Sequence, residues 1–239
     1  MEHRVVPVSP PTGEDGGMAF SGFGRDALAF FAALEGDNSK ACWTAHLSTF
    51  ETDVRIPMKA FAEEVDASFR PLVIFRPHRD VRFAKDKSPY KTHIGAVGEL
   101  EGGSIVYVQL SSRGLMAACG YYMMATDQLE RYRAAVADDQ TGPQLESAIA
   151  AVKKAKLTVS HGGGEPLKTA PRGYSRDHPR IGLLQWKGVI ASRDFGSPSW
   201  LHGVGVLKQV QQVWRSAAPL CSWLDTHVGP STLIPDDRR

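Results

Sequence analysis

The chain has few cysteines, no long apolar run and no internal repeat, and each absence excludes a class of protein. Its three cysteines are odd in number and form no C-x-x-C pair, so a disulfide framework is excluded and a reducing cytoplasm is the expected location. No stretch of about 18 apolar residues is present, and residues 1–17 lack the apolar segment of a signal peptide. We therefore expect neither membrane insertion nor secretion.

The composition is that of an ordinary globular protein. The chain has 239 residues, of which 42% are hydrophobic and 23% are charged. A chain of this length buries roughly 70% of its unfolded surface, so its core needs no structural metal or disulfide. We expect no metal and no cofactor, and the composition alone names no reaction.

The periodicity of apolar residues predicts an α+β fold in a single domain, with a small, mainly antiparallel sheet in the middle of the chain and helices before and after it. Residues 1–18 are rich in proline and glycine and are expected to be a flexible leader, 19–234 the domain and 235–239 a tail. The expected strands are 72–75, 104–110 and 115–122, and the expected helices lie in 25–35, 38–54, 57–69, 127–136, 143–152, 179–186 and 206–224.

Positive charge is concentrated in two short segments, although the whole chain carries a net charge of only +2. Residues 76–91 contain six basic and two acidic side chains, and residues 168–187 contain five basic and one acidic, so each segment has a net charge of +4. The rest of the chain therefore carries −6. Such asymmetry favours an anionic partner.

The first basic segment places more cations together than its own acids can neutralise. If it is extended, Arg76 and Arg82 lie on one face, because alternate residues of a strand point the same way. Crowded cations repel unless carboxylates or a bound anion compensate them, and guanidinium groups match phosphate and carboxylate. The segment therefore indicates an anion site, or alternatively a solvated charged face or an ion-pair network.

The second basic segment is predicted to form a loop whose proline and glycine residues fix its shape. Pro171, Gly173 and Pro179 keep it out of regular structure, so Arg172 and His178 are displayed on a loop, where binding groups are common. A helix that begins at Pro179 would leave free backbone N–H groups that favour an anion. The alternative is that the loop covers the core, with His178 as a buried hydrogen-bonding residue.

Three separated stretches carry a family resemblance: FRPHRDVRFAKDKSPYKTHIGA (75–96), DNSKACWTAH (37–46) and LKTAPRGYSRDHPRIGLL (167–184). They resemble, in order, the motifs of the domain-of-unknown-function 2461 family, and the resemblance covers roughly residues 20–229. Ala84 stands where the family usually has serine, and His78 where it commonly has an aromatic residue. The resemblance implies no established activity.

Three other short motifs lack the accompanying residues that their usual functions require. The HRD of 78–80 lacks the leucine and asparagine of a kinase catalytic loop, and the HGGG of 161–164 is accompanied by no G-x-S-x-G nucleophile elbow. Cys42 and His46 are spaced as two metal ligands on one helix, but no clear third ligand is near in sequence. These stretches predict a turn and ordinary packing.

The sequence therefore predicts a cytoplasmic protein whose basic pocket binds a small anionic ligand, with phosphorylated compounds as one class. We expect both segments to share one anion, and whether a reaction follows stays open, with Asp80, Asp86 and His178 as the nearby proton-transfer candidates. A nucleic-acid-binding protein, in which Tyr90 or Tyr174 stacks on a base, is the alternative, and a non-catalytic interaction module is the second; no membrane partner is expected. The residues expected to line the ligand site are Arg76, Arg79, Arg82, Lys85, Lys87, Tyr90, Lys91, Lys168, Arg172 and His178.

Overall fold

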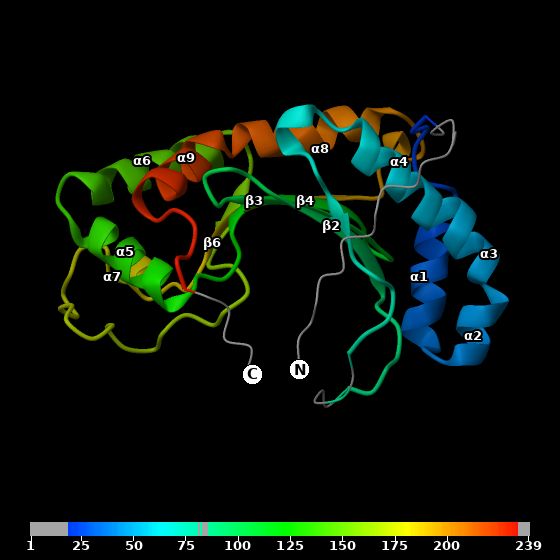
Figure 1. The fold of residues 1–239 in the computed structure, drawn as a ribbon, viewed down its shortest axis with the longest axis horizontal. Helices are drawn as coiled ribbons and strands as arrows, with labels where there is room; N and C mark the ends of the chain where they lie inside the picture. The colour runs from blue at the N-terminus through cyan, green and yellow to red at the C-terminus, as the bar shows by residue number, and fades with distance from the viewer. Residues whose placement is uncertain (1–18, 81, 83–85, 234–239) are drawn as a thin grey trace.

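An antiparallel sheet of six strands, in the order β1-β2-β3-β4-β6-β5, forms the centre of the protein (Figure 1). The computed structural model describes residues 19–80, 82 and 86–233, so the predicted leader and the tail at 235–239 lie outside the described residues. The strands are β1 (Val73–Ile74), β2 (His93–Glu99), β3 (Ile105–Ser111), β4 (Gly114–Tyr121), β5 (Thr158–Ser160) and β6 (Val189–Gly196). The predicted α+β class, with helices before and after the sheet, is confirmed.

Alternation in the central strands gives the sheet two different faces. In β3, Val106, Val108 and Leu110 are fully buried, whereas the residues between them are half-buried. A tight turn joins β3 to β4, and Gly114 begins β4 with a φ of +107°, a conformation that glycine adopts without strain. The apolar alternation predicted this hairpin.

The N-terminal third is helical, as predicted, but its helices are less regular than the sequence pattern suggested. After α1 (Ala27–Gly36) and α2 (Lys40–Ala45), the chain runs without a break through α3 (Leu47–Thr49), the π-helical segment η1 (Phe50–Arg55) and α4 (Ile56–Glu64). Pro57 has no N–H to donate, and the chain takes its π-helical turn immediately before it. The expected helix over 57–69 ends early, and a 3-10 turn, η2 (Ala67–Phe69), follows.

The helices of the C-terminal half lie close to the predicted positions. They are α5 (Thr126–Ala137), α6 (Thr141–Lys154), α7 (Ile181–Leu184), η3 (Ser199–His202), α8 (Gly205–Ser216) and α9 (Ala218–His227). None of the helices within the described residues is long and apolar enough to cross a membrane.

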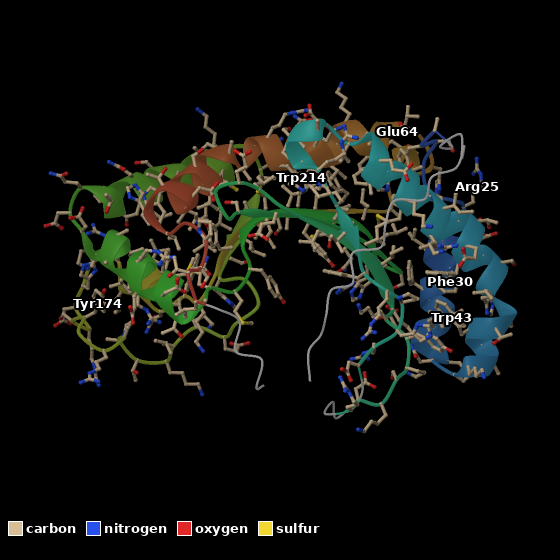
Figure 2. All side chains as sticks on the ribbon, in the orientation of Figure 1. Arg25, Phe30, Trp43, Glu64, Tyr174 and Trp214 are labelled. Atoms are coloured by element: carbon tan, nitrogen blue, oxygen red, sulfur yellow. The ribbon has the colours of Figure 1, made fainter. Side chains whose placement is uncertain are left out.

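The helices that contact the central strands, α1, α8 and α9, pack on one face of the sheet. Trp214 of α8 is buried against Phe61 and Phe69, with ring centroids 6.4 and 5.0 Å away, and its indole N–H donates to the carbonyl of Tyr107 at 3.1 Å (Figure 2). The opposite face of the sheet opens downward in Figure 1, and no helix in the described part of the chain covers it. This open face positions the candidate site.

Candidate functional site

The first basic segment forms a hairpin that extends the β1–β2 edge of the sheet (Figure 1). The amide of Phe75 donates to the carbonyl of Gly95 at 2.9 Å, that of Arg79 to Pro89 at 2.9 Å, and that of Lys91 to Pro77 at 2.8 Å. We call the described residues of this segment, 76–80, 82 and 86–91, the basic hairpin. The pairing register shifts between β1–β2, where Ile74 lies opposite Ala96, and the hairpin, where His78 lies opposite Tyr90, so the side chains of the hairpin do not continue the alternation of the sheet.

The hairpin is anchored to the N-terminal helices through Tyr90. The Asn38 side chain accepts from the Tyr90 amide at 2.9 Å and donates to the Tyr90 carbonyl at 3.1 Å. Trp43 of α2 stacks face to face on the Tyr90 ring, with centroids 4.3 Å apart and planes 4° apart. Tyr90 is 6% exposed and does not line the basic pocket, so its ring anchors the hairpin within the core.

The two acidic residues of the hairpin each hold an arginine of the same segment. Arg79 pairs with Asp86, and Arg82 pairs with both carboxylate oxygens of Asp80, at 2.7 Å for its closest contact. Hydrogen bonds from Ser88 and then Arg79 lower the pKa of Asp86 to about 2, and those from Arg82 lower the pKa of Asp80 further below its usual value. Both carboxylates are therefore ionised at neutral pH, which makes them poor proton donors.

A basic pocket of about 340 Å³ opens at the base of the hairpin, lined by Arg79, Asp80, Lys91, Thr92 and His93. Burial lowers the pKa of Lys91, and the nearby Arg76 lowers it further. Burial also lowers the pKa of His93, with additional contributions from Lys91 and Arg79. The cations here act on one another, while Asp80 is already engaged by Arg82.

The remaining predicted residues of the hairpin lie outside this pocket. Arg76 and Arg82 are exposed, and the ammonium of Lys87 donates to the carbonyl of Arg82 at 3.5 Å. Lys85 lies outside the described residues. Arg76 nevertheless contributes to the positive field at the pocket through its effect on Lys91.

The second basic segment lies on the other side of the open sheet face. The hairpin follows β1, whereas Lys168 and Arg172 are exposed on the loop after β5, at the opposite edge of the sheet. Figure 1 shows the two segments on opposite sides, and Figure 2 shows Trp43, beside the hairpin, far from Tyr174 of the loop. The structure does not bring the two segments together around one small anion.

Part of the charge of the second segment has a structural role. The buried Arg180 guanidinium donates to the carbonyls of Val136, Ala137 and Asp138 at 2.6, 3.1 and 3.1 Å, where α5 leaves its last carbonyls without helical partners. His178 accepts a hydrogen bond from the Arg180 amide at 3.1 Å. His178 therefore supports the start of α7, away from the basic pocket.

An apolar pocket of about 410 Å³, which the sequence did not predict, lies on the open face of the sheet beside the basic pocket. The polar side chains that line it include His93, Tyr107, Gln109 and Tyr122, and the Tyr107 hydroxyl donates to the Gln109 side-chain oxygen at 2.9 Å. Burial raises the pKa of Tyr107 to about 12, so this hydroxyl stays protonated. The lining residues are Phe75, His93, Val97, Ile105, Tyr107, Gln109, Met116, Ala118, Cys119, Tyr122 and Ile190.

His93 lines both pockets, and sequence reasoning did not include it among the candidate site residues. A lone histidine at the start of a strand shows no motif spacing. Its position two residues after Lys91 was the available signal, since two such residues of a strand share a face.

No metal centre is evident among residues 19–80, 82 and 86–233, which contain no group of three or more potential ligands. The Cys42 sulfur lies 3.7 Å from His46 Nδ1, and that nitrogen is also 2.9 Å from the carbonyl of Cys42. Cys42 is partly buried against the hydrophobic core.

A family model described as "Conserved hypothetical protein (DUF2461)" matches residues 26–223 and confirms the resemblance seen in the three sequence motifs. No curated protein and no solved structure matches the chain.

Proposed function

The chain belongs to the DUF2461 family of conserved hypothetical proteins, and from the geometry of its site we propose that it binds a small anionic ligand at the base of the basic hairpin. One observation carries the proposal: Arg79, Lys91 and His93 line one pocket, and the pKa values of Lys91 and His93 are both lowered by burial and by neighbouring cations. An anion placed among them would relieve this repulsion.

The chemistry of the lining suits an oxyanion. Arg79 supplies a planar guanidinium and Lys91 an ammonium, and both donate to phosphate, sulfate or carboxylate oxygens. Thr92 adds a hydroxyl to the lining. Asp80 is the one acid among these lining residues, and its carboxylate is already held by Arg82.

The site favours a small ligand over a nucleic acid. Base stacking on Tyr90 would need a free ring face, whereas Trp43 covers one face and the His78 ring lies 5.2 Å away. The isoelectric point of the sequence is about 8.4. Nucleic-acid-binding domains typically have an isoelectric point above about 9.

The proposal is tested by titrating the protein with inorganic phosphate and sulfate, measuring affinity by calorimetry and stability by thermal melting. We expect Lys91→Gln and Arg79→Gln each to weaken binding roughly tenfold or more, since a charge-assisted hydrogen bond is worth about 1.5–3 kcal/mol. The unliganded variants should melt at or near the wild-type temperature, because the Arg79–Asp86 pair is largely exposed and a repulsive cation is removed.

Lys168→Gln is the matched control, because it removes an exposed lysine from the other basic segment. Unchanged anion affinity in both hairpin variants would overturn the proposal. So would tight binding of duplex DNA at physiological salt that falls steeply as salt rises, because that behaviour marks the release of many counterions.

A further inference from the structure

The basic pocket and the apolar pocket are adjacent, because His93 forms part of the wall of both. The ammonium of Lys91 also lies 5.0 Å from the centroid of the Phe75 ring, which lines the apolar pocket. Positive charge and apolar surface thus meet at one boundary.

The apolar pocket is built by aromatic side chains on the open sheet face. Phe75 and Tyr107 lie with ring centroids 6.2 Å apart. Gly95 makes room for Tyr107, because a Cβ at position 95 would lie 2.6 Å from the Tyr107 hydroxyl oxygen. These residues give the pocket a broad apolar floor.

The far wall is formed by Tyr122, which is 54% exposed although it lines the pocket. The amide of Gly163 donates to the Tyr122 carbonyl at 2.9 Å, and a Cβ at position 163 would lie 2.2 Å from the Tyr122 ring. The glycine-rich turn therefore holds Tyr122 in place while leaving its ring accessible.

We propose that the ligand is amphiphilic: a small molecule whose anionic group binds Arg79, Lys91 and His93 and whose aromatic or short aliphatic body fills the apolar pocket. The inference rests on the proposed function and adds the chemical class of the ligand. The charge at one end of the pocket argues for a ligand with one anionic end.

The dimensions suit a compact ligand. About 410 Å³ lies within the range of roughly 300–1,000 Å³ found for small-molecule sites, which are mostly apolar with a few polar groups that orient the ligand. The Tyr107–Gln109 hydrogen bond supplies such a polar group on the floor, where a substituent of the ligand could exchange with it.

Three probes separate the two halves of the site: inorganic phosphate, 1-naphthyl phosphate and the uncharged 1-naphthol. We expect the wild-type protein to bind 1-naphthyl phosphate at least roughly tenfold more tightly than inorganic phosphate, because the apolar pocket removes the naphthyl ring from water. It should bind 1-naphthol more weakly than 1-naphthyl phosphate.

Ala118→Leu fills the pocket from its floor, since Ala118 lies between Tyr107 and Ser192 in neighbouring strands. It should abolish the preference for 1-naphthyl phosphate and leave inorganic phosphate binding unchanged. Met116→Gln is a second variant in case the leucine disturbs folding, because it places a polar side chain of similar length in the half-buried lining. Met123→Gln is its control, as Met123 is 61% exposed and does not line the pocket.

The outcomes distinguish the two proposals. If inorganic phosphate binds and 1-naphthyl phosphate binds no better, the amphiphilic ligand is overturned while the anion site stands. If neither phosphate binds, both proposals fail. If 1-naphthol binds as tightly as 1-naphthyl phosphate and Lys91→Gln changes neither, the pockets are independent and the inference is overturned. Light scattering tests whether a second copy covers the open face instead. If the protein is a dimer, does not bind 1-naphthyl phosphate and is not dissociated by it, the amphiphilic ligand is overturned.

Discussion

At the scale of single residues, His93 controls the charge where the two pockets meet. Its pKa is lowered from 6.5 by burial, Lys91 and Arg79, so the folded protein holds it neutral at pH 7. Because the unfolded chain binds this proton more readily, the free energy of unfolding should fall as the pH drops through about 6.5. A bound anion would favour the protonated imidazole and oppose that loss.

This linkage predicts pH-dependent anion binding. Between pH 8 and pH 5.5 the affinity for sulfate, whose own charge does not change in this range, should rise roughly threefold to tenfold in the wild-type protein. His93→Gln should flatten the profile while retaining binding through Arg79 and Lys91. Calorimetric titration at each pH measures both. A profile that is equally steep in the variant would show that another group takes up the proton.

Asn38 joins the hairpin to the helices through both backbone groups of Tyr90. We expect Asn38→Ala to reduce the free energy of unfolding by about 2 kcal/mol, because the buried amide and carbonyl of Tyr90 lose their partner. Urea denaturation measures the change, and Lys40→Ala, at an exposed position of the same region, should lie within about 0.5 kcal/mol of wild type. Equal stability of Asn38→Ala and wild type would show that the hairpin does not depend on this anchor.

The sequence could predict some of the residues that line the basic pocket, because clustered charge is visible without the fold. Arg79 and Lys91 were expected on that ground, and both line the basic pocket. The burial of Tyr90 was not predicted, because an aromatic residue among cations resembles a stacking platform. Only the tertiary contact with Trp43 shows that its ring belongs to the core.

At the scale of secondary-structure elements, Arg180 clamps the end of α5 to the start of α7. Its guanidinium is 7% exposed and serves three backbone carbonyls. The close packing leaves no room at Gly142, where a Cβ would lie 2.3 Å from Arg180 Nε. These hydrogen bonds account for Arg180, one of the basic residues of the second segment, without a bound ligand.

Replacing this clamp should destabilise the protein. We expect Arg180→Met to lower the free energy of unfolding by about 3 kcal/mol, because buried carbonyls are left without donors. Chemical denaturation checks this value against Arg176→Met, an exposed residue of the same loop that should change stability little. If the two variants were equally stable, the Arg180 hydrogen bonds would contribute nothing net.

Whether a strand could be predicted from the sequence depended on its amino-acid composition. β3 and β4 were expected because apolar alternation and a glycine turn mark them in the sequence. β2, β5 and β6 were missed: β2 contains two glycines, β5 has only three residues, and β6 carries a serine, an arginine and an aspartate in succession that interrupt its apolar pattern. Pairing with β3 and β4 stabilises β2 and β6, which is long-range information that a local pattern lacks.

At the scale of the whole molecule, the sheet is packed on one face and open on the other. The central strands β3 and β4 pair on both sides, so we expect their amides to exchange with solvent most slowly, and those of β1 and β5 faster. Hydrogen exchange with and without 1-naphthyl phosphate should show added protection in 75–79 and 89–97 but not in 165–180. Protection confined to 165–180 would place the ligand on the second basic segment instead.

The separation of the two basic segments could not be predicted from local sequence. Charge counting treats them alike, whereas the strand order sends one to the β1–β2 edge and the other to the β6–β5 edge. The fold class could be predicted from the sequence, and so could the basic character of the pocket formed by the first segment. The placement of the apolar pocket between the edges depends on which residues face the open side of the assembled sheet.

The strand lengths have a further consequence for solubility. Both edges of the sheet are short, with two residues in β1 and three in β5, whereas the inner strands have seven or eight. An edge strand offers unpaired N–H and C=O groups to another chain, and the number of such groups scales with its length. Within the described residues, the strands β1 and β5 themselves therefore offer neighbouring copies little backbone on which a continuous intermolecular sheet could grow, although one face of the sheet carries no helix.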